Sequence, residues 1–230
     1  MCGTLSAAWP TLRRSSPRTR PGRCIPSCSE PKDGPPLPSA RAEAEAVAGF
    51  LPGSTVLIDS AATADAIEAG LHDHPIAHFA CHGRAVAATE HPDVGGLVLS
   101  KGNGLFVPTF VRNLRTTNAQ LAFLSACDTA GPNPTLLDEP LNLASAFHLA
   151  GFRGVIGTLW HTADSTETAE TVYATLTARG TRPPDTAQAA SALTETLRRT
   201  RDAYLAVPTR WAAHIHLPCL TNRKRFTRPM

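Results

Sequence analysis

The sequence predicts an α/β protein built on a mostly parallel sheet with helices on both faces. From Ser39 almost to the end of the chain, short apolar runs alternate with amphipathic, helix-forming segments. Proline and glycine separate many of these segments, as they do at the ends of helices and strands. Strands that are joined through helices usually pair in parallel and are covered on both sides. A layered α/β sandwich is therefore expected.

The first predicted helix covers residues 41–51, a run of good helix formers that ends at Pro52-Gly53. Thr63 is a favourable N-cap residue, so a second helix is expected at Thr63–Ala69. Short uninterrupted apolar runs predict buried strands before and after that helix, at Thr55–Ile58 and Ile76–Ala80.

Two further strands, Gly96–Leu99 and Leu105–Val107, are predicted to pair as a hairpin, because the Lys-Gly-Asn-Gly segment between them is typical of a turn. A short helix is expected after Pro108. The later elements alternate again: strands at Ala119–Ser125, Arg153–Leu159 and Trp211–Leu217, and helices at Asp138–Ala150, Ser165–Ala178 and Asp185–Leu205.

The two ends of the chain differ in composition from the rest. Residues 1–38 hold eight of the 20 prolines and five arginines, with no apolar periodicity, and are predicted to be a disordered tail. Residues 39–217 are expected to form the folded domain, and residues 218–230 a basic C-terminal tail.

The net charge of +3 at pH 7 also comes from the ends. Residues 1–40 and residues 221–230 each carry a net charge of +4, which leaves −5 for residues 41–220. An acidic body with basic tails does not predict a nucleic-acid partner. No apolar run approaches the roughly 20 residues that span a bilayer, so no membrane association and a cytoplasmic location are expected.

Two predicted strands end in reactive side chains. The first is followed by Cys-His-Gly at 81–83, and the second by Ala-Cys-Asp-Thr at 126–129. Cysteine hydrolases need a thiolate with an imidazole close to it. If the two strands are parallel neighbours, His82 and Cys127 emerge at the same edge of the sheet. Gly83 leaves room for a substrate carbonyl, and its N–H together with that of Cys127 could hold an oxyanion.

These residues belong to a series of motifs that resembles the CHAT domain, a branch of the caspase-like cysteine peptidases related to caspases and separase. The series reads HFACHG, GGLVLS, LAFLSACDTA, LNLASAFHLAGFRGVIGTLWHTADSTETAETVY and RWAAHIHL, and the resemblance covers roughly residues 33–217. It implies a caspase-like three-layer α/β/α sandwich with a mostly parallel central sheet. It also implies His82 as the catalytic histidine, Cys127 as the nucleophile and Gly83 as an oxyanion-hole donor.

The function that the resemblance implies is a cysteine-type endopeptidase that acts on a protein or peptide substrate in signal-triggered proteolysis and needs no metal and no other cofactor. CHAT proteins often carry an upstream module that controls the peptidase, so a regulatory partner or a missing upstream module is expected. Residues 1–30 show no apolar strand, and the first core strand of the family is therefore expected to be absent. The alternative is a catalytically silent interaction module or an incomplete domain.

Other reactive residues have simpler interpretations. Asp128 is a candidate for shaping the substrate pocket or for bonding local amides. Cys81 should point to the opposite face of its strand from His82 and fill the core. A cluster with zinc-ligand chemistry also lies in this region, but its spacing is poor for one ion; it comprises His72, His74, His78, Cys81 and His82.

Overall fold

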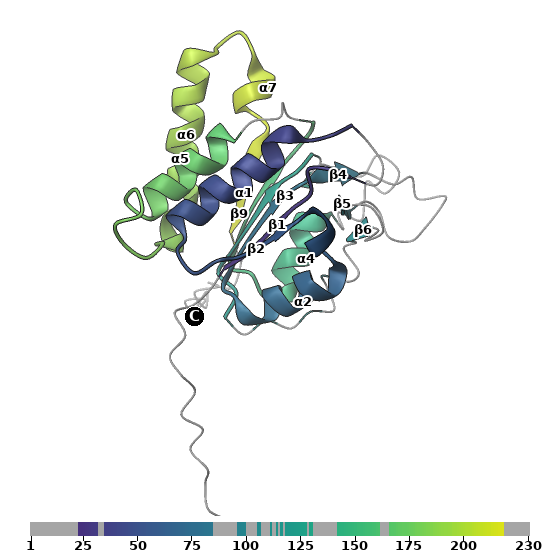
Figure 1. Ribbon diagram of the computed structural model, residues 1–230. Coiled ribbons are helices and arrows are strands. Elements are labelled where there is room, and N and C mark those ends of the chain that lie inside the picture. The colour runs from purple at the N-terminus through teal and green to yellow at the C-terminus, as the bar shows by residue number, and fades with distance from the viewer. Residues whose placement is uncertain are drawn as a thin grey trace, which may run out of the picture.

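The computed structural model describes residues 23–31, 35–84, 96–99, 105–106, 111, 114, 116, 118–127, 129–130, 142–161 and 166–218. Within these residues, a central sheet has six strands in the order β2-β1-β3-β7-β8-β9 (Figure 1). All neighbouring strands are parallel except β8 and β9. The predicted fold class, α/β with a mostly parallel sheet, is confirmed.

The central strands are β1 (Arg23–Ser27), β2 (Thr55–Ile58), β3 (Ile76–Ala80), β7 (Leu121–Ser125), β8 (Gly154–Thr158) and β9 (His214–Pro218). A small second sheet holds β4 (His82–Arg84), β5 (Gly96–Val98) and β6 (Leu105–Phe106). The helices are α1 (Pro38–Phe50), α2 (Ala64–Asp73), α4 (Leu143–Ala150), α5 (Glu167–Leu176), α6 (Ala189–Ala203) and α7 (Pro208–Trp211).

Two layers of helices cover the central sheet. Figure 1 shows α1, α5 and α6 on one face and α2 and α4 on the other. Each face has its own apolar core: Val47, Phe123 and Val172 lie in the first, and Leu71 and Phe147 lie in the second. Burial of apolar surface on both faces explains why the strands are continuous apolar runs. The result is a three-layer α/β/α sandwich.

The expectation that the first core strand is absent is wrong. β1 lies inside the sheet between β2 and β3, and all five of its residues are buried. Residues 23–31 therefore do not belong to a disordered tail, and the boundary expected at residue 39 lies too late; residues 1–22 are outside the described part. The segment gave no strand signal because it reads Arg-Cys-Ile-Pro-Ser. Pro26 stands opposite Leu57 of β2 and has no partner in the register with β3, where the paired residues are Arg23, Cys24 and Ser27.

Ile25 tests how much β1 contributes to stability. Its side chain is fully buried, whereas its partner Val56 on the edge strand β2 is only half-buried. We expect Ile25→Ala to lower the free energy of unfolding by about 2–5 kcal/mol, because the cavity it leaves is enclosed. Val56→Ala, the matched control, should cost less than half as much. Urea unfolding measures both, and equal losses would contradict an internal position for Ile25.

Most other elements agree with the sequence. The strands Thr55–Ile58 and Ile76–Ala80 have the expected bounds, and Thr63 caps α2 by accepting a hydrogen bond from the Ala66 N–H. α2 continues to Asp73, beyond the expected end at Ala69. The hairpin pairing of β5 with β6 is confirmed, although its turn lies outside the described residues, as does most of the helix expected after Pro108.

Two differences have local causes. The last strand begins at His214 rather than Trp211, because Pro208 starts a short helical turn, α7. His82 begins a short strand, β4, that pairs with β5 and that was not among the predicted strands. The part of the Asp138–Ala150 helix that is described begins at Leu143, with Asn142 as its N-cap, and Gly151 ends it in a left-handed conformation.

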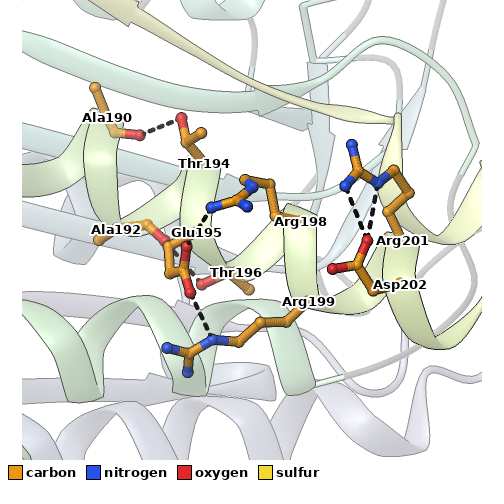
Figure 2. A network of polar contacts seen from close by, with 9 residues as sticks. All are labelled: Ala190, Ala192, Thr194, Glu195, Thr196, Arg198, Arg199, Arg201 and Asp202. Atoms are coloured by element: carbon orange, nitrogen blue, oxygen red, sulfur yellow. Dashed lines mark hydrogen bonds and ion pairs between the residues drawn. The ribbon is translucent and has the colours of Figure 1, made fainter.

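Helix α6 shows how the outer layer divides its polar and apolar sides. Glu195 pairs with Arg198 and Arg199 on the exposed side, and Arg201 pairs with Asp202 (Figure 2). Such exposed ion pairs contribute about 1 kcal/mol or less each. On the other side, the buried threonines of α6 return their hydroxyl hydrogen bonds to carbonyls one turn earlier. Among the described helices, none has the length and apolar composition needed to cross a membrane.

Candidate active site

Strands β3 and β7 bring the two predicted reactive residues to one edge of the sheet. The strands are parallel neighbours with Ala80 opposite Ser125, and the Cys81 N–H donates to the Ser125 carbonyl at 3.3 Å. His82 and Cys127 each follow two residues after the end of these strands. The expectation that both emerge at the carboxyl edge of neighbouring parallel strands is therefore confirmed.

Gly83 lies directly against the backbone of Cys127. A Cβ atom built on Gly83 would be 1.8 Å from the Cys127 carbonyl oxygen and 3.1 Å from its nitrogen. No side chain fits at such distances, so this close approach requires glycine. Gly83 was expected to leave room for a substrate carbonyl. Its lack of a side chain also lets the segments of Gly83 and Cys127 come into contact.

The His82 ring is oriented by a backbone carbonyl. Its Nε2 lies 2.8 Å from the carbonyl oxygen of Pro35, just before α1. A carbonyl oxygen only accepts hydrogen bonds, so in neutral His82 the proton sits on Nε2. Nδ1 then carries the free lone pair and is the atom that can accept a proton. Pro35 is a site residue that the sequence did not indicate, since its contribution is a main-chain atom.

A cavity of about 500 Å³ opens at this edge of the sheet. His82 and Cys127 both line it, together with residues from the start of α1, from α5, from the end of α6 and from α7. The lining residues that matter for the charge of the cavity are Glu43, His161, Glu167, Arg210 and His214.

Cys127 is the most accessible of the four cysteines that the structure describes. Cys24, Cys28 and Cys81 are buried, whereas Cys127 is partly exposed. Burial raises the pKa of Cys24 to about 12 and raises the pKa of Cys81, to which the nearby Cys28, Glu43 and Cys127 also contribute. A buried thiol with a raised pKa is a poor nucleophile. Cys81 packs in the core as expected. Cys127 is therefore the better candidate for a nucleophile at this edge of the sheet.

A buried pair of ionisable residues lies beneath the cavity. Glu43 on α1 is 3% exposed, and its Oε1 is 3.3 Å from Nε2 of the fully buried His78 on β3. The sequence reasoning missed Glu43. A signal was present, because Glu43 occupies the same helix face as the buried Ala40, Ala44 and Val47. A glutamate on an apolar stripe is unusual and marks a position with a special role.

Two other predictions concerned Asp128 and a possible zinc site. Asp128 lies outside the described residues. Within the described part of the chain, no group of three or more His, Cys, Asp or Glu side chains is placed to hold a metal ion. The zinc alternative finds no support in the geometry either, because His78 faces Glu43, Phe123 and Tyr173 while His82 contacts Pro35.

The comparisons with known proteins concern the family and the fold. The family model for the CHAT domain matches residues 5–218. Two structures of the Saccharomyces cerevisiae separase–securin complex are similar to the chain, with TM-scores of 0.58 and 0.56 and identities of 15% and 14%. Each similarity covers 86% of this chain but 12% of the matched chain, so the chain spans a small part of that length. The fold is caspase-like. No curated protein matches the sequence.

Proposed function

The chain belongs to the CHAT domain family, and on this premise we propose that it is a cysteine endopeptidase that uses Cys127 and His82. CHAT domains and separase share the caspase-like peptidase fold. The observation that carries the proposal is the contact of Gly83 with the Cys127 backbone, because it joins the segments of His82 and Cys127, the two residues that line the cavity.

Acylation begins with proton transfer from the Cys127 thiol to Nδ1 of His82. The thiolate attacks the carbonyl carbon of the scissile peptide bond and gives a tetrahedral oxyanion. His82 then returns the proton to the departing amine, and the C–N bond breaks. The Pro35 carbonyl supports both transfers, since it fixes the ring orientation and stabilises the imidazolium by accepting from Nε2–H.

The oxyanion needs preorganised donors. We assign this role to the backbone N–H groups of Gly83 and Cys127, which the contact between these residues holds near each other. In deacylation, His82 takes a proton from a water molecule that attacks the thioester carbonyl, the C–S bond breaks to release the carboxylic acid, and His82 returns the proton to the Cys127 sulfur. These steps need no metal and no organic cofactor.

Other parts of the proposal concern substrate and control. The substrate is a protein or peptide, and Asp128, which follows the nucleophile, contributes to the pocket. The separase structures contain securin, a protein partner. By analogy, we assign this domain a protein regulator or an upstream controlling module, a place in signal-triggered proteolysis and a cytoplasmic location.

The Cys127–His82 pair is tested by alkylation. At pH 7, iodoacetamide should label Cys127 much faster than the buried Cys24, Cys28 and Cys81. His82→Ala should slow the labelling of Cys127 by about tenfold, because an unassisted thiol is only a few per cent thiolate at this pH. Mass spectrometry of tryptic peptides over time gives the rate at each cysteine.

His161→Ala is the matched control, since His161 lines the same cavity and is exposed. It should leave the labelling rate of Cys127 within about twofold of the unsubstituted protein. An unchanged rate in His82→Ala would contradict the pair. The peptidase activity itself is tested by hydrolysis of a peptide library that depends on Cys127.

A further inference from the structure

The Pro35 carbonyl orients the His82 ring, so whatever holds Pro35 in place also holds the ring. Pro35 precedes α1 and lies in no helix or strand, so regular hydrogen bonds of that kind do not fix its position. Two residues further along the chain, the Leu37 N–H donates to the carbonyl oxygen of Ser29 at 3.0 Å. Ser29 comes just after β1. The position of Pro35 therefore depends on how the end of β1 is held.

Asp59 holds the end of β1. It is the first residue after β2, and its Oδ1 accepts from the Ser29 N–H at 2.7 Å and from the Glu30 N–H at 3.3 Å. The Ser29 hydroxyl lies 2.8 and 2.9 Å from the two carboxylate oxygens. Oδ2 also accepts from Nη2 of Arg41 on α1, at 2.8 Å. The Asp59 carboxylate therefore binds the chain before Pro35 and the helix after it.

The backbone of Asp59 is in an uncommon conformation. Its φ is +48°, in the left-handed region that residues other than glycine seldom adopt and that Asp and Asn tolerate better than most. Such strain persists where surrounding contacts hold it, and it is frequent at functional sites. Asp59 does not line the cavity. Any effect of Asp59 on the reaction must therefore pass through the segments that it binds.

We propose that Asp59 is a positioning residue for His82. By holding the end of β1 and the start of α1, it sets the place of the Pro35 carbonyl and, through this carbonyl, the orientation of the His82 ring. The inference rests on the proposed function, because it takes His82 as the group that accepts the Cys127 proton. It adds a residue that lies outside the cavity and touches neither of the two reacting side chains.

The path from Asp59 to the ring consists of printed contacts and short stretches of chain. Asp59 binds Ser29, the Ser29 carbonyl accepts from Leu37, and Pro35 lies two residues before Leu37. The donors from the end of β1 are N–H and hydroxyl groups, which need an oxygen acceptor of the right shape rather than a charge. The ion pair with the exposed Arg41 adds little, since solvent weakens it. Asparagine at position 59 should therefore be able to replace the aspartate.

Alkylation of Cys127 by iodoacetamide provides the first test, because it requires no peptide substrate. Asp59→Gly accepts the positive φ but removes the acceptor, and it should slow labelling by about three- to tenfold. The loss should not exceed that of His82→Ala. Asp59→Asn keeps an acceptor oxygen and tolerates the same backbone conformation, so its rate should stay within about twofold of the unsubstituted protein. An unchanged rate in Asp59→Gly would overturn the inference.

Thr63→Ala is the matched control for stability. Thr63 lies in the same connection between β2 and α2 and caps the helix, but it is not on the path to Pro35. Loss of this cap should lower stability and leave the rate of Cys127 labelling within about twofold. Slow labelling in Thr63→Ala equal to that in Asp59→Gly would show a general loss of stability and would overturn the proposed role.

A double variant separates positioning from stability. If Asp59 acts through the His82 ring, Asp59→Gly should have no further effect once the ring is absent. The variant with both Asp59→Gly and His82→Ala should therefore label Cys127 within about twofold of the rate in His82→Ala alone. A further loss of threefold or more in the double variant would contradict the path through His82.

The two proposals fail in different ways. If Asp59→Gly slows labelling only when His82 is present but no peptide is cleaved, the positioning inference stands and the peptidase proposal is wrong. If peptides are cleaved through Cys127 while Asp59→Gly keeps the full labelling rate, the peptidase proposal stands and the inference is wrong. If Asp59→Gly does not fold, as judged by circular dichroism, Ser29→Ala replaces it. Loss of this hydroxyl donor should slow labelling about threefold, again only when His82 is present.

Discussion

Replacement of Cys127 by alanine is expected to abolish peptide hydrolysis, with a loss in kcat of about 10⁴-fold or more. The nucleophile forms the acyl intermediate, so no partial reaction remains when the sulfur is removed. The measurement is the appearance of new peptide N-termini by mass spectrometry after incubation with a diverse peptide library. Circular dichroism should show an unchanged fold, because Cys127 is partly exposed and not in either apolar core.

Cys81→Ala is the informative control for this experiment. Cys81 lines the same cavity and directly precedes His82, but its thiol is buried and its pKa is raised. We expect this variant to keep most of its activity while losing about 1 kcal/mol of stability from the smaller core side chain. Hydrolysis that survives in Cys127→Ala but is lost in Cys81→Ala would contradict the assignment of Cys127 as the nucleophile.

Gly83→Ala is expected to produce the next largest effect, a loss of about 100-fold or more in kcat/KM. The added Cβ would meet the Cys127 carbonyl oxygen at 1.8 Å, and this neighbour is backbone rather than a movable side chain. The segments that hold His82 and Cys127 must therefore separate, which misplaces both reacting groups and both oxyanion donors. Overpacking of this kind also costs about 1–3 kcal/mol of stability.

The matched control is Gly49→Ala. A Cβ on Gly49 meets no atom within 4 Å, and the residue lies in α1, where alanine is the better helix former. This variant should be as active as the unsubstituted protein and equally or more stable. Steady-state kinetics and thermal unfolding of the two variants give the comparison. Full activity in Gly83→Ala would show that the contact with Cys127 is not needed for function.

The sequence was most informative where a segment is buried on both faces. The strands Thr55–Ile58 and Ile76–Ala80 were located to the residue because their apolar runs have clear ends. β1 escaped detection because Arg23 and Pro26 interrupt its apolar run, and its place between β2 and β3 depends on long-range pairing that a local pattern does not reveal. β4 is three residues long and contains glycine, so its pairing with β5 also depends on tertiary context.

Some residues of the candidate site could be predicted from the sequence and others could not. His82 and Cys127 could be located because each follows a recognisable strand, and parallel strands bring their carboxyl ends to one edge. Glu43 and Pro35 could not, because their relation to the site comes from how α1 packs on the sheet. Residues far apart in sequence, such as Pro35 and His82, meet only through that packing.

The main-chain acceptor at Pro35 has a consequence for how the His82 ring responds to its surroundings. In many enzymes a carboxylate holds the histidine, and that support is lost when the carboxylate is protonated in acid. An amide carbonyl has no proton to gain in this range, so the hydrogen bond from Nε2 persists at every pH at which the fold persists. It also survives any side-chain replacement at position 35 that leaves the backbone path unchanged. The orientation of the ring is thus fixed by chain geometry and is independent of the ionisation of a third residue.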